Sequence, residues 1–579
     1  MLSRRELLWL ATLATSSGLL SKKGMRAKYP TSFWDHQKSP PTTPFVRPLP
    51  CPRPPNLVSG FPLTGCEPPF PFPPNVTRHH RIVEEEVSLE LHPDLPLTSV
   101  WRYRDMSIAA RAHGDQFGLF MAGPTIIAKW LTPTVVRMRN NLPKKHVGFG
   151  VNHTTTHYHG AHCEARSDGF PEQGMSPNPT FDPIVLPGEE RDYCYAMQDV
   201  GFSTGEPSPE ERPATQWYHD HLLDFTGANV QRGLAGFLLA FDDLDTGDEM
   251  TGLRLPSLLH PGTGDVPGFD IPLVFADRLI APDGSLVYLP EDFDGFIGDK
   301  HLVNGRIDPF LEVEARKYRL RILIGTNAAM LGLRLINASG ETFPFDAIAN
   351  GGGLFASPIR DLDFTGVLAP AMRLDIIVDF SQFPVGTKLY LEDAIKQEDG
   401  RGPDGDFEDP DLFPAGEGSK RLEFRVVPAT GPDNSQVPNV LRPITPIPQS
   451  ELDAATRREF EFHRGNGAWK INGEFVDIDT PCATIPLNTP EIWTLKNGGG
   501  GWWHPIHVHL EFMRILTRNG KQPPLRERDG FSKTDTINLG PGDEVEAFFK
   551  FRDFPGPWVF HCHNIEHEDH FMMVRFDVS

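Results

Sequence analysis

Histidine pairs separated by a single residue are the feature of this sequence best able to support chemistry. A random chain with 22 histidines in 579 residues would contain about one such pair. Four pairs are present: His157 and His159, His219 and His221, His507 and His509, and His561 and His563. Side chains alternate across a β-strand, so each pair can direct two imidazoles at one metal site. Imidazole suits copper, zinc and iron alike, so the pairs predict a small metal cluster without identifying the metal.

Cys562 narrows the choice of metal. It is the middle residue of the fourth pair, so its side chain points to the opposite side of the strand. His504, three residues before His507, also faces away from the cluster pair. Two imidazoles, one thiolate and one thioether are the ligands of a blue copper electron-transfer site. The sequence therefore predicts a blue copper held by His504, Cys562, His567 and Met572.

The elements that must position these ligands repeat three times. Proline-containing turns followed by alternating strands begin at Leu186, Leu368 and Leu539. Alternating strands that end in an asparagine turn recur as VVRMRNNL, KYRLRILIGTN and EIWTLKNGG. Frequent turns also agree with 57 prolines and 53 glycines. Three copies of an antiparallel unit predict an all-β protein of three stacked β-sandwich domains.

The repeat also predicts the domain boundaries. We expect an export signal at 1–24, a proline-rich strap at 25–82, domains at 83–245, 246–428 and 457–579, and a linker at 429–456. Asp220 stands in copy one where copy three has Cys562, and copy two has no histidine pair. Copies one and three would therefore enclose the cluster, copy three alone would hold the blue copper, and copy two would be a spacer.

The N-terminus and the charge indicate the compartment and exclude some partners. Arg4 and Arg5 precede the apolar run Leu7–Leu20, and SRRELL resembles a twin-arginine signal, although no clean A-x-A cleavage site follows. A loose amphipathic N-terminus is the alternative to an exported, periplasmic or extracellular protein. A net charge of -22 disfavours nucleic acid as a partner. No other apolar stretch approaches the ~20 residues of a membrane span.

The cysteines leave the disulfides open. Export would permit Cys51 to pair with Cys66, or Cys163 with Cys194, but sequence alone does not determine connectivity. If Cys562 is a metal ligand, the remaining cysteines are odd in number.

These motifs resemble those of three-domain multicopper oxidases, the group of laccases, bilirubin oxidases and bacterial spore-coat laccases. The resemblance covers most of the chain from about Pro124, including WYHDH with GLAGF, VNGRIDPFLEVEARKYRLRI and HPIHVHL. The tail HCHNIEHEDHFMM is especially similar to the bilirubin oxidase and spore-coat branch. The resemblance implies cupredoxin-like Greek-key domains and four coppers per chain: one type 1, one type 2 and two type 3. We expect a monomer.

The resemblance also assigns roles to single residues. His157 and His507 would bind type 2 copper. The type 3 pair would be bound by His159, His219, His221, His509, His561 and His563. Type 1 copper would be bound by His504, Cys562 and His567, with Met572 as the weak axial ligand.

Two carboxylates complete the predicted site. Glu568 aligns with the family's acidic residue that is thought to deliver protons to oxygen, and Asp168 in SDGFPE aligns with an aspartate that lies behind the ligands near the cluster. A positioned carboxylate can relay the protons that oxygen reduction consumes. Phe571 departs from the pattern, because close relatives often carry an acidic residue there, which puts substrate preference in doubt. Trp502 and Trp503 could line a substrate surface or fill the core.

The predicted function is an oxidase that takes single electrons from phenols, aromatic amines or a tetrapyrrole such as bilirubin and reduces dioxygen to water. One alternative is a metallo-oxidase acting on Fe(II), Mn(II) or Cu(I), although 13 methionines without a cluster argue against Cu(I). Another is a non-enzymatic interaction protein with the cupredoxin fold, disfavoured because every motif ligand is present. Substrate contacts lie in loops, so the sequence does not identify the natural reductant.

Overall fold

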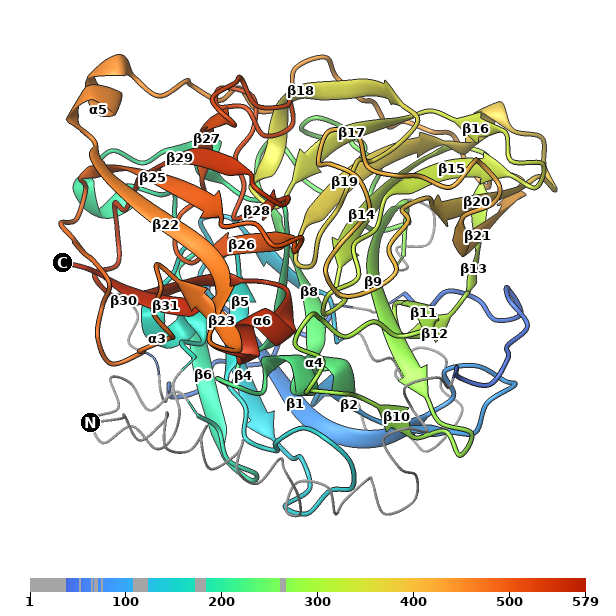
Figure 1. The fold of residues 1–579 in the computed structure, drawn as a ribbon. Coiled ribbons are helices and arrows are strands. Elements are labelled where there is room, and N and C mark those ends of the chain that lie inside the picture. The colour runs from blue at the N-terminus through green and yellow to red at the C-terminus, as the bar shows by residue number, and fades with distance from the viewer. Residues whose placement is uncertain are drawn as a thin grey trace.

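The computed structural model describes residues 38–51, 54–63, 66, 71–73, 76–107, 123–171, 184–260 and 267–579. The predicted export signal at 1–24 and part of the predicted strap lie outside them. The described strands form six sheets, which pack in pairs around three apolar cores and so make three β-sandwiches (Figure 1). Among the described residues, no helix is long and apolar enough to cross a bilayer.

The first sandwich carries two of the histidine pairs. One sheet has the order β2 (Thr98–Asp105), β1 (Arg78–Leu89), β4 (Thr134–Asn140) and β6 (Glu190–Tyr195). The other has the order β3 (Ile126–Lys129), β8 (Ala235–Phe241), β7 (Thr215–Asp220) and β5 (Thr156–His159). Aromatic side chains from both sheets, such as Tyr103, Tyr193 and Tyr218, fill the core between them.

The middle sandwich is the largest. One sheet has the order β12 (Arg306–Ile307), β11 (Lys300–Val303), β9 (Asp270–Ile280), β14 (Lys317–Ile324), β19 (Arg373–Asp379), β17 (Phe345–Asn350) and β18 (Gly353–Leu362), with β10 (Leu286–Val287) paired to β9. The other has the order β13 (Phe310–Glu314), β21 (Ser419–Val427), β20 (Lys388–Asp393), β15 (Leu333–Asn337) and β16 (Thr342–Phe343).

Strand β14 shows why the middle sandwich is more than the predicted spacer. Its aliphatic side chains face the apolar core, and strand alternation turns Arg319 and Arg321 to the opposite face. There Arg319 forms an ion pair with Asp245 at 2.6 Å, and Arg321 donates to the Thr215 hydroxyl at 2.8 Å. Both partners belong to the segment 83–245, so buried polar bonds tie the first two sandwiches together.

The third sandwich carries the other two histidine pairs. One sheet has the order β23 (Ala468–Ile471), β22 (Thr456–Gly465), β25 (Pro490–Asn497), β29 (Glu544–Lys550) and β27 (Arg514–Arg518). The other has the order β24 (Thr484–Ile485), β31 (Met573–Val578), β30 (Gly556–Cys562), β26 (His504–Val508) and β28 (Thr536–Leu539). Figure 1 shows this sandwich beside the first, with the middle one completing the triangle.

Short helices follow the strands that carry ligands. Helix α3 (Ala165–Asp168) follows β5, and α6 (Ile565–Asp569) follows β30. Gly169 ends α3 with φ 82°, and a Cβ there would lie 2.2 Å from the Thr156 carbonyl oxygen, so this close approach to β5 requires glycine. Asn564 caps α6 by accepting a hydrogen bond from the backbone N–H of His567 at 3.4 Å.

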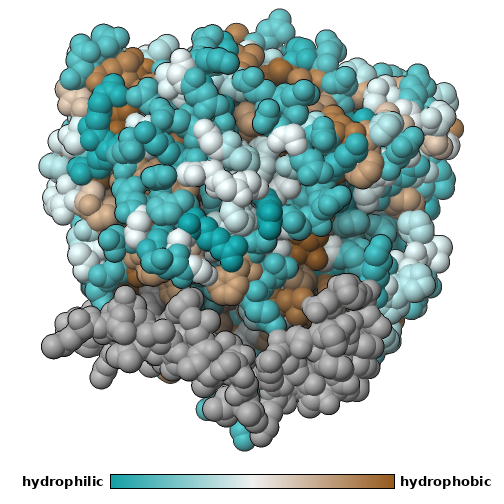
Figure 2. Space-filling view, in the orientation of Figure 1, coloured by the Kyte–Doolittle hydropathy of each residue, from teal (hydrophilic) through white to brown (hydrophobic). Residues whose placement is uncertain are grey.

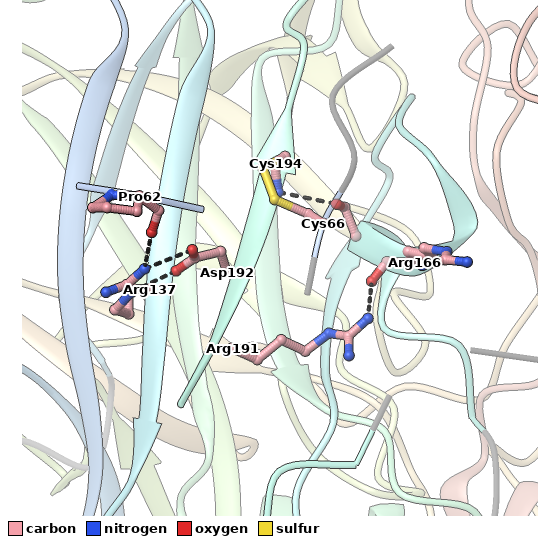
Figure 3. Close-up of a disulfide and its surroundings, with 8 residues drawn as sticks. Pro62, Cys66, Arg137, Arg166, Arg191, Asp192 and Cys194 are labelled. Carbon is pink, nitrogen blue, oxygen red and sulfur yellow. Dashed lines mark hydrogen bonds and ion pairs between the residues drawn. A yellow bond between two sulfur atoms is a disulfide. The ribbon is translucent and has the colours of Figure 1, made fainter. Parts of the chain in front are cut away.

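A disulfide joins Cys66 to Cys194 of β6 (Figure 3), so neither pairing considered from the sequence forms. The reason is strand alternation in β6. Tyr193 and Tyr195 face the core of the first sandwich, where Cys163 is also buried, whereas Cys194 faces the other side. The bond therefore fastens the segment before β1 to the outside of the first sandwich.

The face of the molecule in Figure 2 is mostly hydrophilic, with apolar side chains scattered over it.

Candidate metal centres

Strand register brings the four histidine pairs face to face. Within the first sandwich, β5 and β7 are antiparallel and pair His157 directly with His219. Within the third sandwich, β26 and β30 are antiparallel and pair His507 directly with His561. Each outer sandwich therefore presents two adjacent strands whose imidazoles point the same way.

The imidazoles form three groups whose ligand nitrogens lie within 4.8 Å of one another. The groups are His157, His159 and His507; His159, His219 and His563; and His221, His509 and His561. Every group draws on both outer sandwiches, so the candidate cluster lies between them. The two histidines of each of the last three pairs belong to different groups, so the expectation that a pair serves one metal site is wrong for these pairs.

Hydrogen bonds behind the imidazoles determine which nitrogen faces inward. The Nδ1 atoms of His157, His219 and His507 contact the carbonyl oxygens of Asp168, Asp220 and Asp535 at 2.6, 2.8 and 2.8 Å. Each of these Nδ1 atoms must donate, which leaves the Nε2 lone pair free. Among the described residues, the Nε2 atoms of these three histidines are buried without a hydrogen-bond partner. Orphaned nitrogens that converge in this way fit a metal ligand set.

His159 has the opposite orientation. Its Nε2 contacts the Thr536 hydroxyl at 3.2 Å, and its Nδ1 is the buried atom without a partner within the described part of the chain. The ring of His159 also stacks on that of His507, with centroids 3.6 Å apart.

Burial favours the neutral form of five of these histidines. Desolvation lowers the pKa of each of the five, and the charge of neighbouring imidazoles lowers it further. The pKa falls well below 6.5 for His159, His219, His507, His509 and His563. Neutral imidazole is the form that binds a metal ion, so the cluster can accept metal without first losing protons from these rings.

Both predicted carboxylates lie directly behind the imidazoles. Asp168 contacts two of them: its carbonyl oxygen accepts from His157, and its Oδ2 lies 2.6 Å from Nδ1 of His509. Glu568 bridges two others, with Oε1 3.2 Å from Nδ1 of His221 and Oε2 3.0 Å from Nδ1 of His561. Burial alone would raise the pKa of Glu568, but His561 and His221 outweigh it and hold that pKa well below its usual value.

A second centre lies on the other side of β30. The Sγ of Cys562 is 3.5 Å from Nδ1 of His504 and 3.6 Å from Nδ1 of His567, and the two Nδ1 atoms are 3.1 Å apart. Atoms bound to one metal at roughly 2.0 to 2.3 Å would be separated by similar distances. Burial raises the pKa of the Cys562 thiol well above its usual value, so a thiolate here needs a cation to replace its proton.

Met572 lies next to this centre. Its backbone N–H donates to the His567 carbonyl at 3.0 Å, and its carbonyl accepts from the Cys562 N–H at 3.1 Å. The side chain is fully buried in the core of the third sandwich. The structure thus places all four residues predicted for the blue copper site in one neighbourhood.

An aromatic cover lies over the imidazoles of this second centre, both of which are fully buried. Trp469 lies against His567, with ring centroids 3.7 Å apart, and Trp502 meets Trp469 edge to face at 5.3 Å. Trp503 instead packs into the core. The sequence left open whether these two tryptophans line a substrate surface or fill the core. Trp503 is a core residue, whereas Trp502 is half-buried above the site.

Sequence reasoning missed several residues that touch the candidate ligands. Asp535 and Thr536 contact His507 and His159, and Trp469 covers His567. Asp535 carries no motif of its own, and its contact with His159 spans both sandwiches. The only local signal is the string KTDT, whose last residue, Thr536, begins β28 (Thr536–Leu539).

Comparison with known proteins agrees with this arrangement. Residues 446–579 match the family described as multicopper oxidase. A bilirubin oxidase from Albifimbria verrucaria is 31% identical over 554 residues, covering 94% of this chain and 82% of that protein. A laccase from Haloferax volcanii is 34% identical over 541 residues, covering 86% and 81%.

Solved structures show the same fold. The McoA multicopper oxidase 2F4 variant from Aquifex aeolicus superimposes with a TM-score of 0.70 at 24% identity, covering 92% of this chain and 99% of that one. A multicopper oxidase from Pediococcus acidilactici gives 0.69 at 22% identity, covering 94% and 93%. The predicted fold class, all-β with three cupredoxin-like domains, is confirmed.

Proposed function

We propose a reaction for this chain from the premise that it belongs to the multicopper oxidase family and is therefore a copper oxidoreductase. The proposed reaction couples one-electron oxidation of an organic donor to the four-electron reduction of dioxygen to water. The donors we propose are phenols, aromatic amines or a bilirubin-like tetrapyrrole. Two of the relatives named above are a bilirubin oxidase and a laccase.

The donor sets suit four coppers per chain. We assign type 2 copper to His157 and His507, one type 3 copper to His159, His219 and His563, and the other to His221, His509 and His561. Type 1 copper would be held by His504, Cys562 and His567, with the Met572 thioether as a weaker fourth ligand. Bound copper would supply the one-electron acceptor at the thiolate site and the oxygen-reducing centre between the outer sandwiches.

The observation that carries this proposal is the division of strand β30 between the two centres. Cys562 faces His504 and His567, while its neighbours His561 and His563 belong to the imidazole groups on the other side. A single peptide bond therefore separates Cys562 from each of these two histidines. This connection supports passage of electrons from a surface donor to the cluster through one strand.

The two carboxylates support the proton part of the reaction. Glu568 is fully buried between two cluster imidazoles, where its carboxylate can take up protons and pass them on to the oxygen-reducing centre that bound copper would supply. Asp168 orients His509 and His157 through hydrogen bonds at 2.6 Å. We propose proton delivery for Glu568 and ligand orientation for Asp168.

The surface above the thiolate site supports an aromatic donor. Trp502 donates its indole N–H to Asp294 at 3.0 Å, and the guanidinium groups of Arg401 and Arg464 lie 5.1 and 5.5 Å from its ring. A half-buried aromatic ring beside guanidinium groups can contact an aromatic donor. An electron would then enter through Trp502 and Trp469, because the imidazoles beneath are buried.

A metal-ion donor is the second candidate. Four carboxylates gather near this surface, and burial together with the charges of Asp294, Asp399 and Glu291 raises the pKa of Asp292 to about 6. Such a negative field would attract Fe(II) or Mn(II).

We also propose that the protein is exported to the periplasm or the extracellular space. The N-terminal sequence resembles an export signal. The Cys66–Cys194 disulfide suits an oxidising compartment.

Oxygen uptake measured against donor oxidation tests the function. The proposal predicts four one-electron oxidations for each dioxygen consumed, with no hydrogen peroxide released. A ratio of two with peroxide as product would contradict it. Parallel assays with a phenol, bilirubin, Fe(II) and Mn(II) then separate the organic donors from the metal ions.

A further inference from the structure

Asp535 lies directly behind two cluster imidazoles. Its carbonyl oxygen accepts from Nδ1 of His507 at 2.8 Å, and its Oδ1 is 3.7 Å from Nε2 of His159. The Thr536 hydroxyl completes the contact, because it donates to Asp535 Oδ1 at 3.1 Å and lies 3.2 Å from the same His159 nitrogen. The position of this one residue therefore affects both an imidazole assigned to type 2 copper and one assigned to type 3 copper.

Arg373 of the middle sandwich holds Asp535 in place. Its Nη1 donates to Asp535 Oδ1 at 3.0 Å, and its Nη2 donates to Oδ2 of the same carboxylate. The remaining N–H groups donate to backbone carbonyls of Thr215 in the first sandwich and of Gly351 and Ala371 in the middle one. One fully buried guanidinium thus bonds to all three sandwiches.

The pair has no room to move. A Cβ at Gly160, the residue after His159, would lie 2.7 Å from Asp535 Oδ2. A Cβ at Gly351 would lie 2.8 Å from the guanidinium of Arg373 and 2.9 Å from Asp535 Oδ1. Backbone from the first and middle sandwiches therefore encloses the ion pair on both sides.

From this geometry we infer that Arg373 is a positioning residue for the copper cluster, acting through Asp535 on His507. The inference rests on the proposed cluster. Type 2 copper is the most sensitive member, because it has two protein imidazoles, whereas each type 3 copper has three. Without Arg373, the Asp535 carboxylate would be buried beside the cluster without its partner, and the carbonyl that orients His507 would shift. The middle sandwich is then a working part of the cluster.

The test is Arg373→Gln in the copper-loaded full chain, with type 2 copper followed by EPR and by chelator titration and type 1 copper followed by its blue absorption. We expect type 2 affinity to fall by roughly 10- to 100-fold, as for other residues that orient metal ligands. Blue absorption should stay at the wild-type level. Arg373→Lys keeps the charge but loses the paired hydrogen bonds to the Asp535 carboxylate. Its type 2 copper affinity should lie between those of wild type and Arg373→Gln.

Arg316→Gln is the matched control. Arg316 is as buried as Arg373 and forms ion pairs with Glu249 at 2.5 Å and Asp433 at 3.2 Å. Neither of these partners contacts an assigned copper ligand through the ion pair. It should lower thermal stability while type 2 affinity stays unchanged. Equal loss of type 2 copper in the control, or unchanged type 2 affinity in Arg373→Gln, would overturn the inference.

Asp535→Asn covers the case in which Arg373→Gln does not fold. It keeps the backbone carbonyl and the side-chain shape but removes the charge, and the same selective loss of type 2 copper is expected. Wild-type type 2 affinity in this variant would also refute the inference. If copper-loaded wild-type protein gives no type 1 and no type 2 EPR signal, the proposed copper centres themselves are refuted. Failure of the proposed function is thus distinguishable from failure of the inference about Arg373.

Discussion

The Sγ atom of Cys562 lies 3.5 Å from Nδ1 of His504, on the side of strand β30 that faces away from the imidazole groups. The residues on either side of this cysteine belong to two of those groups. A single strand therefore separates the two candidate centres.

Cys562→Ser should abolish the blue absorption and the oxidase activity while the fold stays intact. Serine has nearly the same shape, but its hydroxyl is not a thiolate and does not form the same bond to copper. Absorption spectra and circular dichroism of the copper-loaded variant check this. Blue absorption that persists would show that another residue supplies the thiolate-like ligand.

Met572→Leu should keep copper bound but raise the type 1 reduction potential, because the weak axial ligand tunes it. Leucine fills a similar volume in the apolar core, so stability should change by less than about 1.5 kcal/mol. A redox titration of the blue band measures the potential. If the potential equals that of the wild type, Met572 is not axial.

Glu568→Gln should slow steady-state turnover by roughly a hundredfold or more, the usual contribution of a positioned proton donor. Reduction of type 1 copper by the donor without oxygen should keep its wild-type rate, because that step needs no proton at the cluster. Glu84→Gln is the control, since Glu84 is an equally buried carboxyl that bonds to Thr154 and Thr156 and not to an assigned ligand. Equal rates for Glu568→Gln and wild type would remove Glu568 from the proton path.

His162 should make stability depend on pH. Its Nε2 lies 2.9 Å from Asp553 across the contact between the first and third sandwiches. Burial would lower the pKa of His162 and Arg552 opposes its charge, but Asp553 and Glu511 outweigh both and raise that pKa above 6.5. A pKa raised in the folded state stabilises the protein below 6.5, and this contribution is lost as pH rises through the folded-state value.

Thermal unfolding of wild type and His162→Gln across this pH range measures the effect. The wild type should be the more stable at acidic pH, and the two melting temperatures should converge as pH becomes alkaline. If the difference between the two melting temperatures grows as pH rises, the positive charge of His162 does not stabilise the folded protein.

Local patterns in the sequence predicted the parts of the site that depend on one strand. Histidines two residues apart on a β-strand share a face however the strands pack together, and Cys562 must then face the other way. The strand pattern alone did not predict how the imidazoles divide among three groups, because the division depends on how two sandwiches pack. Only the family resemblance separated His157 and His507 from the other six. Nor was the bond between Arg373 and Asp535, which are 162 residues apart and carry no shared motif. The Cys66–Cys194 disulfide was not predicted either, because its cysteines are 128 residues apart and their pairing depends on which face of β6 Cys194 occupies.

Copper analysis combined with EPR of the copper-loaded wild-type protein tests the central assignment most directly. Two classes of ligand set on opposite sides of β30 predict four coppers per chain, with one type 1 and one type 2 signal and a magnetically coupled, silent type 3 pair. A fully loaded protein that lacks the type 1 signal, or whose coppers all give one and the same signal, would contradict it.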